Sequence, residues 1–236
     1  MRILSIDSPF GRALALVADV AIVSMCITIT ALTVVPLGAG LAAGCAVVLQ
    51  LVREEGSRPW HTFWRVFRAS FGRATAGWML WLALVGLSGY ELWLLSNAET
   101  LGVVAGGANV ISDIWRVGII SALLVLGVIA IWFFPIVGQV SLRESAGAES
   151  AGAESRCSFR ACLRVSVLAA LKYAPISLAA VALWAAPVVL TVCYPRVGAG
   201  LVFFYIVFIP AFTLYLTALM MDSRLAQLLE ERIAHS

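Results

Sequence analysis

Charged side chains are scarce in this sequence. Asp, Glu, Lys and Arg make up 12% of its 236 residues, whereas about a quarter is usual for a soluble domain. Hydrophobic residues account for 62% of the chain, and the mean hydropathy is +0.99. Long apolar runs leave too little polar sequence for a separate soluble domain with its own active site. We therefore expect a single membrane domain over residues 1–236, embedded in a lipid bilayer.

The motifs that mark soluble enzymes are absent as well. The chain has no Walker A loop, no G-x-S-x-G and no H-E-x-x-H, and its five cysteines include no C-x-x-C pair. It contains two histidines. We predict that the protein is not an enzyme, has no catalytic residues, binds no metal and no cofactor, and has no nucleic-acid partner.

Six apolar segments are each long enough to cross a bilayer. Residues 13–52 carry one charge, at Asp19, and as one helix they would extend about 60 Å, twice the thickness of a hydrocarbon core. Pro36 is the natural break, because proline disfavours helix at the preceding residue and suits the first turn of the next helix. A five-span alternative would make this run one crossing plus a surface helix and would reverse the N-terminus. The predicted fold class is all-α, a polytopic six-helix transmembrane bundle with helices at about 13–34, 36–52, 74–95, 114–139, 165–190 and 198–221.

The basic residues lie unevenly about these predicted spans. Arg116 and Arg196 are the only ones that fall in loops on one side, and the remaining loop arginines fall on the other. Cytoplasmic loops carry an excess of Lys and Arg, so we expect a multi-pass protein of the cell membrane with both termini in the cytoplasm.

The segment between the second and third predicted spans alternates basic and aromatic residues. Aromatic residues recur there at spacings of three and four, which predicts a basic amphipathic helix over residues 58–73, lying at the membrane interface. One interpretation is an anchor against anionic headgroups, and the other is a docking face for a partner. The candidate docking residues are Arg58, Trp60, Phe63, Trp64, Arg65, Phe67, Arg68 and Phe71.

Small residues mark one face of the second predicted span. Gly40 and Gly44 form a G-x-x-x-G pattern, which lets two helix backbones approach closely. We interpret this face as the packing surface for the first span, with dimerisation as the alternative.

Two charged residues inside the predicted spans are candidates for a polar site. Asp19 and Lys172 fall at similar depth in the first and fifth spans, so they form a candidate intramembrane pair. The alternatives are a lysine that extends to the headgroups while Asp19 faces a wet vestibule, and a proton or substrate site.

Prolines interrupt several of the predicted spans. Broken helices line binding sites in many transporters, although kinks in a passive bundle are commoner. The candidate helix breaks are Pro36, Pro135, Pro175, Pro187 and Pro210.

Several motifs are similar to those of a known family. V-V-P-L-G-A-G at 34–40, L-V-R-E-E-G-S-R-P-W-H-T-F-W-R-V-F-R-A-S-F-G-R-A-T at 51–75 and W-F-F-P-I at 132–136 resemble the YesL-like family of bacterial integral membrane proteins of unknown function. The resemblance implies a protein often encoded beside carbohydrate ABC-transporter components in Gram-positive bacteria. It assigns no biochemical activity.

Two functions follow as expectations. The first is a non-enzymatic accessory component of carbohydrate ABC uptake, which contacts sugar permease subunits through residues 58–73. The alternative is a self-sufficient small-solute carrier or solute-binding membrane component, whose site would comprise Asp19, Lys172 and the proline breaks. An ABC permease and a membrane enzyme are weaker alternatives.

Overall fold

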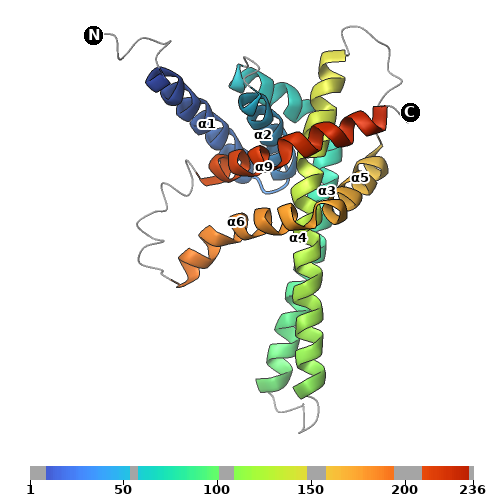
Figure 1. Ribbon diagram of the computed structural model, residues 1–236. Coiled ribbons are helices and arrows are strands. Elements are labelled where there is room, and N and C mark those ends of the chain that lie inside the picture. Colours follow the sequence, from blue (N-terminus) through green and yellow to red (C-terminus); the bar gives the residue numbers. More distant parts are fainter. Residues whose placement is uncertain (1–8, 54–57, 101–108, 148–157, 194–208, 234–236) are drawn as a thin grey trace.

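The computed structural model describes residues 9–53, 58–100, 109–147, 158–193 and 209–233. Within these ranges the only regular secondary structure is helical, and no strand is present (Figure 1). The helices are α1 (Pro9–Ala31), α2 (Leu37–Val52), α3 (Pro59–Thr100), α4 (Asn109–Gly147), α5 (Phe159–Lys172), α6 (Ala174–Cys193) and α9 (Ile209–Ile233).

Helix α2 lies at the centre of the helix cluster and packs against α1, α3, α4 and α9 (Figure 1). Its residues from Gly38 to Leu49 are nearly all buried, and most of them are Gly, Ala, Cys or Val. Short side chains allow neighbouring helices to approach closely. A Cβ added at Gly40 would meet Thr30 of α1, and one added at Gly44 would meet Ile27 of the same helix. The small-residue face predicted on this span therefore packs against α1 within the chain.

The turn between α1 and α2 is fixed by a side chain of α3. The indole nitrogen of Trp78 donates a hydrogen bond of 2.8 Å to the carbonyl oxygen of Val34. Val34 itself has a φ of 52°, a conformation that β-branched residues rarely adopt. α1 consequently ends at Ala31, three residues before the predicted end at 34.

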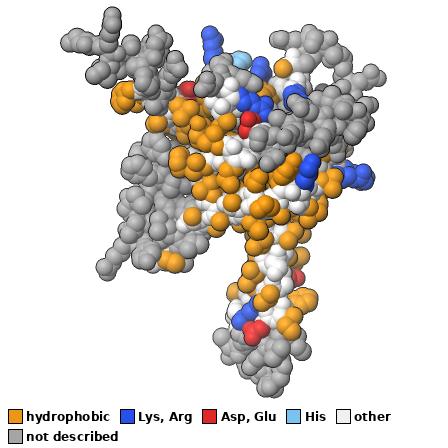
Figure 2. Space-filling view, in the orientation of Figure 1, with side chains coloured by type: hydrophobic (Ala, Val, Ile, Leu, Met, Phe, Trp, Pro, Cys, Tyr) orange, Lys and Arg blue, Asp and Glu red, His pale blue; other side chains and the backbone are white. Residues whose placement is uncertain are grey.

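Helices α3 and α4 lie side by side and project together from the cluster (Figure 1). The projecting part exposes large apolar side chains on its surface, as Figure 2 shows for one face. Three stretches are long and apolar enough to cross a membrane, namely Leu14–Ala31, Pro59–Asn97 and Ser112–Ala146, and a fourth is formed if the bent pair α5 and α6 is one span. These helices indicate a membrane-embedded protein.

The architecture differs from the predicted six-helix bundle in two places. Residues 58–73 do not form a separate interfacial helix, because α3 runs for 42 residues from Pro59 to Thr100 without interruption. No proline follows Pro59 in this helix, and Gly72 alone does not end it. The predicted helix at 165–190 is instead divided into α5 and α6, which meet at an angle of 98°.

The last predicted span is only partly described. Its residues 198–208 lie outside the described residues, and α9 contains the remainder. α9 continues beyond the predicted end at residue 221 to Ile233.

Helices α2 and α4 approach closely where Gly138 crosses Ala42. A Cβ at Gly138 would overlap the carbonyl oxygen of Ala42, whereas a Cβ at Gly118 would meet nothing within 4 Å. We expect Gly138→Ala to lower the free energy of unfolding by about 1–3 kcal/mol, because backbone atoms must move to accept the methyl group. We expect Gly118→Ala, in the same helix, to be neutral or to stabilise by up to about 1 kcal/mol. Thermal unfolding of both variants in detergent tests this, and equal midpoints would contradict the close crossing.

Candidate functional site

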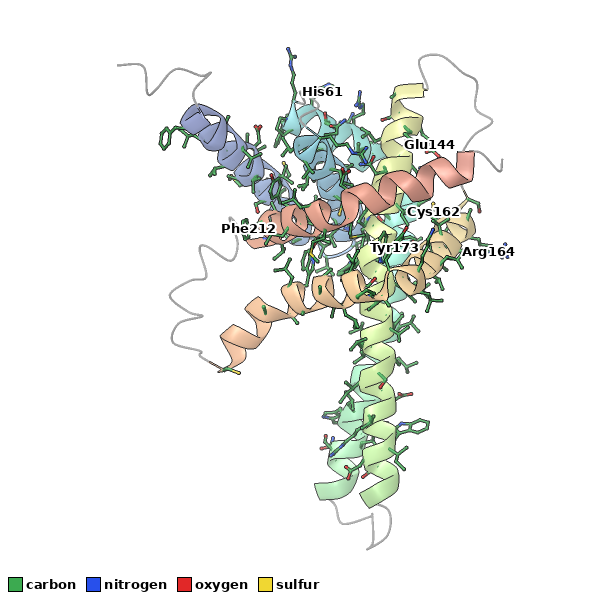
Figure 3. The ribbon with its side chains drawn as sticks, viewed as in Figure 1. His61, Glu144, Cys162, Arg164, Tyr173 and Phe212 are labelled. Atoms are coloured by element: carbon green, nitrogen blue, oxygen red, sulfur yellow. The ribbon has the colours of Figure 1, made fainter. Side chains whose placement is uncertain are left out.

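The first candidate site is a basic surface at the start of α3. We define the basic surface as Arg58, Trp60, His61, Trp64, Arg65 and Arg68. All except Trp64 are exposed, and five of the six, all but Arg58, line an open depression. His61 marks the end of the helix that carries this surface (Figure 3).

The opposite face of the same helical turns is buried. Phe63 and Val66 are wholly inaccessible to solvent, and so is Ser70. Ring contacts connect the two faces, because Trp64 lies edge-on to Phe63 with ring centroids 5.7 Å apart and to Phe67 at 5.2 Å. The predicted aromatic ladder is therefore divided between the core and the surface, and the core residues hold the basic surface in place.

Two arginines on either side of the basic surface are paired. Arg53 donates from Nε to Oδ1 of Asp222 at 2.7 Å. Arg73 donates to both carboxylate oxygens of Glu144, at 2.8 and 2.5 Å, and to Oγ of Ser141 at 3.0 Å. This bidentate contact joins α3 to α4.

The three arginines of the basic surface differ from these two. Within the described part of the chain, no carboxylate forms an ion pair with Arg58, Arg65 or Arg68.

The second candidate site is an apolar cavity of about 690 Å³. Side chains from α1, α2, α3, α4, α6 and α9 line it, and the largest are aromatic: Trp78, Trp81, Phe134 and Trp184. Trp78 and Trp81 stack with ring centroids 5.1 Å apart. The volume lies within the range of ligand pockets, which is roughly 300–1,000 Å³.

The polar groups at this cavity are few. The hydroxyl of Thr28 donates to the carbonyl oxygen of Ser24 at 2.9 Å, and that of Thr217 donates to Thr213 at 2.7 Å. Both hydroxyl protons are therefore already used within their own helices. Nε1 of Trp81 is buried and has no hydrogen-bond partner among the described residues.

The predicted helix breaks have different positions. Pro135 and Pro210 line the apolar cavity. Pro36 precedes α2 as its N-cap residue, Pro175 is the second residue of α6, and Pro187 lies within α6. Pro36 and Pro175 therefore stand at helix boundaries, whereas α4 continues through Pro135 and α6 continues through Pro187.

A polar contact holds the bend between α5 and α6. Trp132 of α4 donates from Nε1 to Oγ of Ser177 at 2.8 Å, and this hydroxyl donates to the carbonyl oxygen of Tyr173 at 3.0 Å. The rings of Trp132 and Tyr173 stack 5.5 Å apart, and Tyr173 lies at the junction (Figure 3). Pro175 cannot donate a backbone hydrogen bond, which favours the break at this point.

Asp19 and Lys172 are not brought together. Asp19 lies in α1 and Lys172 at the end of α5, and these helices lie on opposite sides of α2 and α4 (Figure 1). Lys172 places its ammonium nitrogen 5.6 Å from the ring centroid of Tyr173.

A comparison with protein families identifies one domain. Residues 20–92 match the model of DUF624, described as a protein of unknown function. No curated protein and no solved structure matches this chain. The matched region contains α2, about half of α1, most of α3, and the whole basic surface. Helix α4, which supplies several walls of the cavity, lies beyond it.

Sequence reasoning missed several of these residues. Trp78, Trp81 and Trp184 were not singled out, although Trp78 and Trp81 lie three residues apart and so share one helix face. The contact between Arg73 and Glu144 could have been predicted as well. Arg73 directly precedes the third predicted span and Glu144 follows the fourth, so the two opposite charges fall on the same side of neighbouring spans. The contact between Trp132 and Ser177 had no comparable signal.

The contact between Trp132 and Ser177 can be tested with two single variants and their double variant. Ser177→Ala leaves a buried indole donor without a partner, so we expect it to cost about 1–3 kcal/mol of stability. In a Trp132→Phe background the same substitution should cost less, because no donor is then left unpaired. Thermal unfolding of the four proteins measures the coupling, and strictly additive effects would contradict the hydrogen bond.

Proposed function

We propose that this protein is a multi-pass protein of the plasma membrane, with both termini in the cytoplasm, that serves as a non-enzymatic accessory component of oligosaccharide uptake by an ABC transporter. In this proposal the basic surface of α3 binds an acidic region of a permease subunit. The observation that carries it is a surface with exposed Trp60 and three arginines that form no ion pair within the described residues, on a helix whose other face is buried in the core.

The length of α3 supports a docking role for its first turns. A helix of 42 residues extends about 63 Å, whereas a hydrocarbon core is about 30 Å thick. The apolar residues that suit the membrane follow Ala74, so the first turns would stand beyond it. The ion pairs of Arg53 and Arg73 belong to the same polar end of the helix cluster.

The residue types also suit a protein interface. Tryptophan and arginine are the residues most enriched among those that dominate binding energy. Trp60 is 55% exposed and lies edge-on to Trp64, with ring centroids 5.8 Å apart. Because Phe63 and Val66 are buried, little side-chain and backbone ordering would remain to be done on binding.

The choice of a sugar permease as partner rests on the resemblance of the 51–75 segment to the YesL-like family. The DUF624 match agrees with a family of unknown function and names no partner. Charge complementarity then defines the expected contact, an acidic surface of a cytoplasmic loop on the permease.

Charge reversal on the basic surface tests the proposal. We expect Arg65→Glu with Arg68→Glu to reduce the permease recovered with the tagged protein at least tenfold, equivalent to about 1.4 kcal/mol or more, because attraction becomes repulsion. The matched control is Arg160→Glu with Arg164→Glu, two exposed arginines on α5, and Arg164 points away from the cluster (Figure 3). The measurement is a pull-down in mild detergent from the native host grown on complex glycans, with mass spectrometry of the bound membrane proteins.

Two results would count against docking. One is the recovery of the unaltered protein alone, folded and monodisperse, at native expression levels. The other is an equal loss of permease in the α5 control, which would indicate a nonspecific effect of charge.

The second candidate function is a self-sufficient small-solute carrier or solute-binding membrane component. The apolar cavity of about 690 Å³ favours it, since two of the predicted proline breaks line this cavity. The earlier form of this hypothesis assigned Asp19 and Lys172 to the site, and the cavity is lined by neither. Uptake that is unchanged in the double variant Asp19→Asn with Lys172→Met would exclude these residues from a transport role.

A further inference from the structure

We propose that the apolar cavity binds a hydrocarbon chain of a membrane lipid. The proposal names a ligand class for the cavity and does not depend on docking at the basic surface. Its ligand is an acyl or isoprenoid chain, as opposed to a sugar or another polar solute.

The lining of the cavity selects for hydrocarbon. Its lining includes four aromatic side chains and two prolines, namely Trp78, Trp81, Phe134, Trp184, Pro135 and Pro210. The hydroxyl protons of Thr28 and Thr217 are donated to their own helices. A sugar that entered would lose hydrogen bonds with water and would find almost no replacements, which costs about 1–3 kcal/mol for each unsatisfied group.

The surroundings supply such a ligand. The cavity lies between helices of which three contain stretches apolar enough to span a membrane, so its nearest solvent is lipid. Ordered water needs two to four polar partners, and the lining of this cavity is almost entirely apolar. Filling it with a hydrocarbon chain restores the dispersion contacts that an empty space forfeits.

The experiment uses a phospholipid that carries a photoreactive diazirine within one acyl chain. The full-length protein is placed in nanodiscs that contain this lipid, and crosslinked residues are mapped by mass spectrometry. Labelling of the exposed apolar face of α3 and α4, around Leu87 and Ile120, serves as the internal reference for surrounding lipid. The quantity measured is the ratio of cavity labelling to this reference.

Two cavity-filling variants and one matched control decide the result. Ala130→Phe and Ala218→Phe add a ring at positions that line the cavity, and Ala83→Phe adds the same ring at an exposed position of α3 outside it. We expect the ratio of cavity labelling to reference labelling to fall about tenfold in each cavity variant, which corresponds to about 1.4 kcal/mol of binding free energy. We expect this ratio to be unchanged in Ala83→Phe. An unchanged ratio in folded cavity variants would overturn the proposal.

A second measurement keeps the test decisive if both cavity variants fail to fold. Native mass spectrometry of the unaltered protein, after exhaustive exchange into detergent, should retain one lipid mass per chain. Loss of all lipid there, or an unaltered protein that takes no label at the cavity residues, would also overturn the proposal. Both results are independent of the permease pull-down, so the two proposals can fail separately.

Discussion

Close approach to the backbone of α2 is the constraint on which the remaining packing depends. Four helices contact this one helix of 16 residues, and larger side chains at its glycines and alanines would push them apart. Gly138 of α4 also lacks a side chain at the point where this helix crosses Ala42 of α2, so the two backbones can approach closely there. Because lipid is as apolar as the core, such packing contacts replace the hydrophobic drive that assembles a soluble protein.

Much of the helical pattern could be predicted from the sequence, because membrane spans follow from length and hydropathy alone. The start of α2 after Pro36 and the small-residue face at Gly40 and Gly44 depend on local rules of this kind. The boundaries at residue 73 and at Tyr173 do not. Helix α3 continues through residue 73, where Arg73 contacts Glu144 of α4, and the chain bends at Tyr173, where Trp132 of α4 donates to Ser177. Contacts between helices of this kind cannot be read from the local sequence.

The candidate sites likewise combine features that the local sequence predicts with features that depend on contacts between helices. The spacing of basic and aromatic residues indicated the surface at the start of α3, since that surface belongs to one helix. It did not indicate that Phe63 turns inward, which depends on where α2 lies. The apolar cavity was out of reach of sequence reasoning, because its walls come from six helices and no single segment carries its pattern.

The continuity of α3 has a mechanical consequence. No break in the helix separates the first turns of α3 from its projecting part, so both belong to one element of 42 residues. A partner bound at the first turns would therefore act on the same helix whose Ala74 and Trp78 pack against Gly38 of α2.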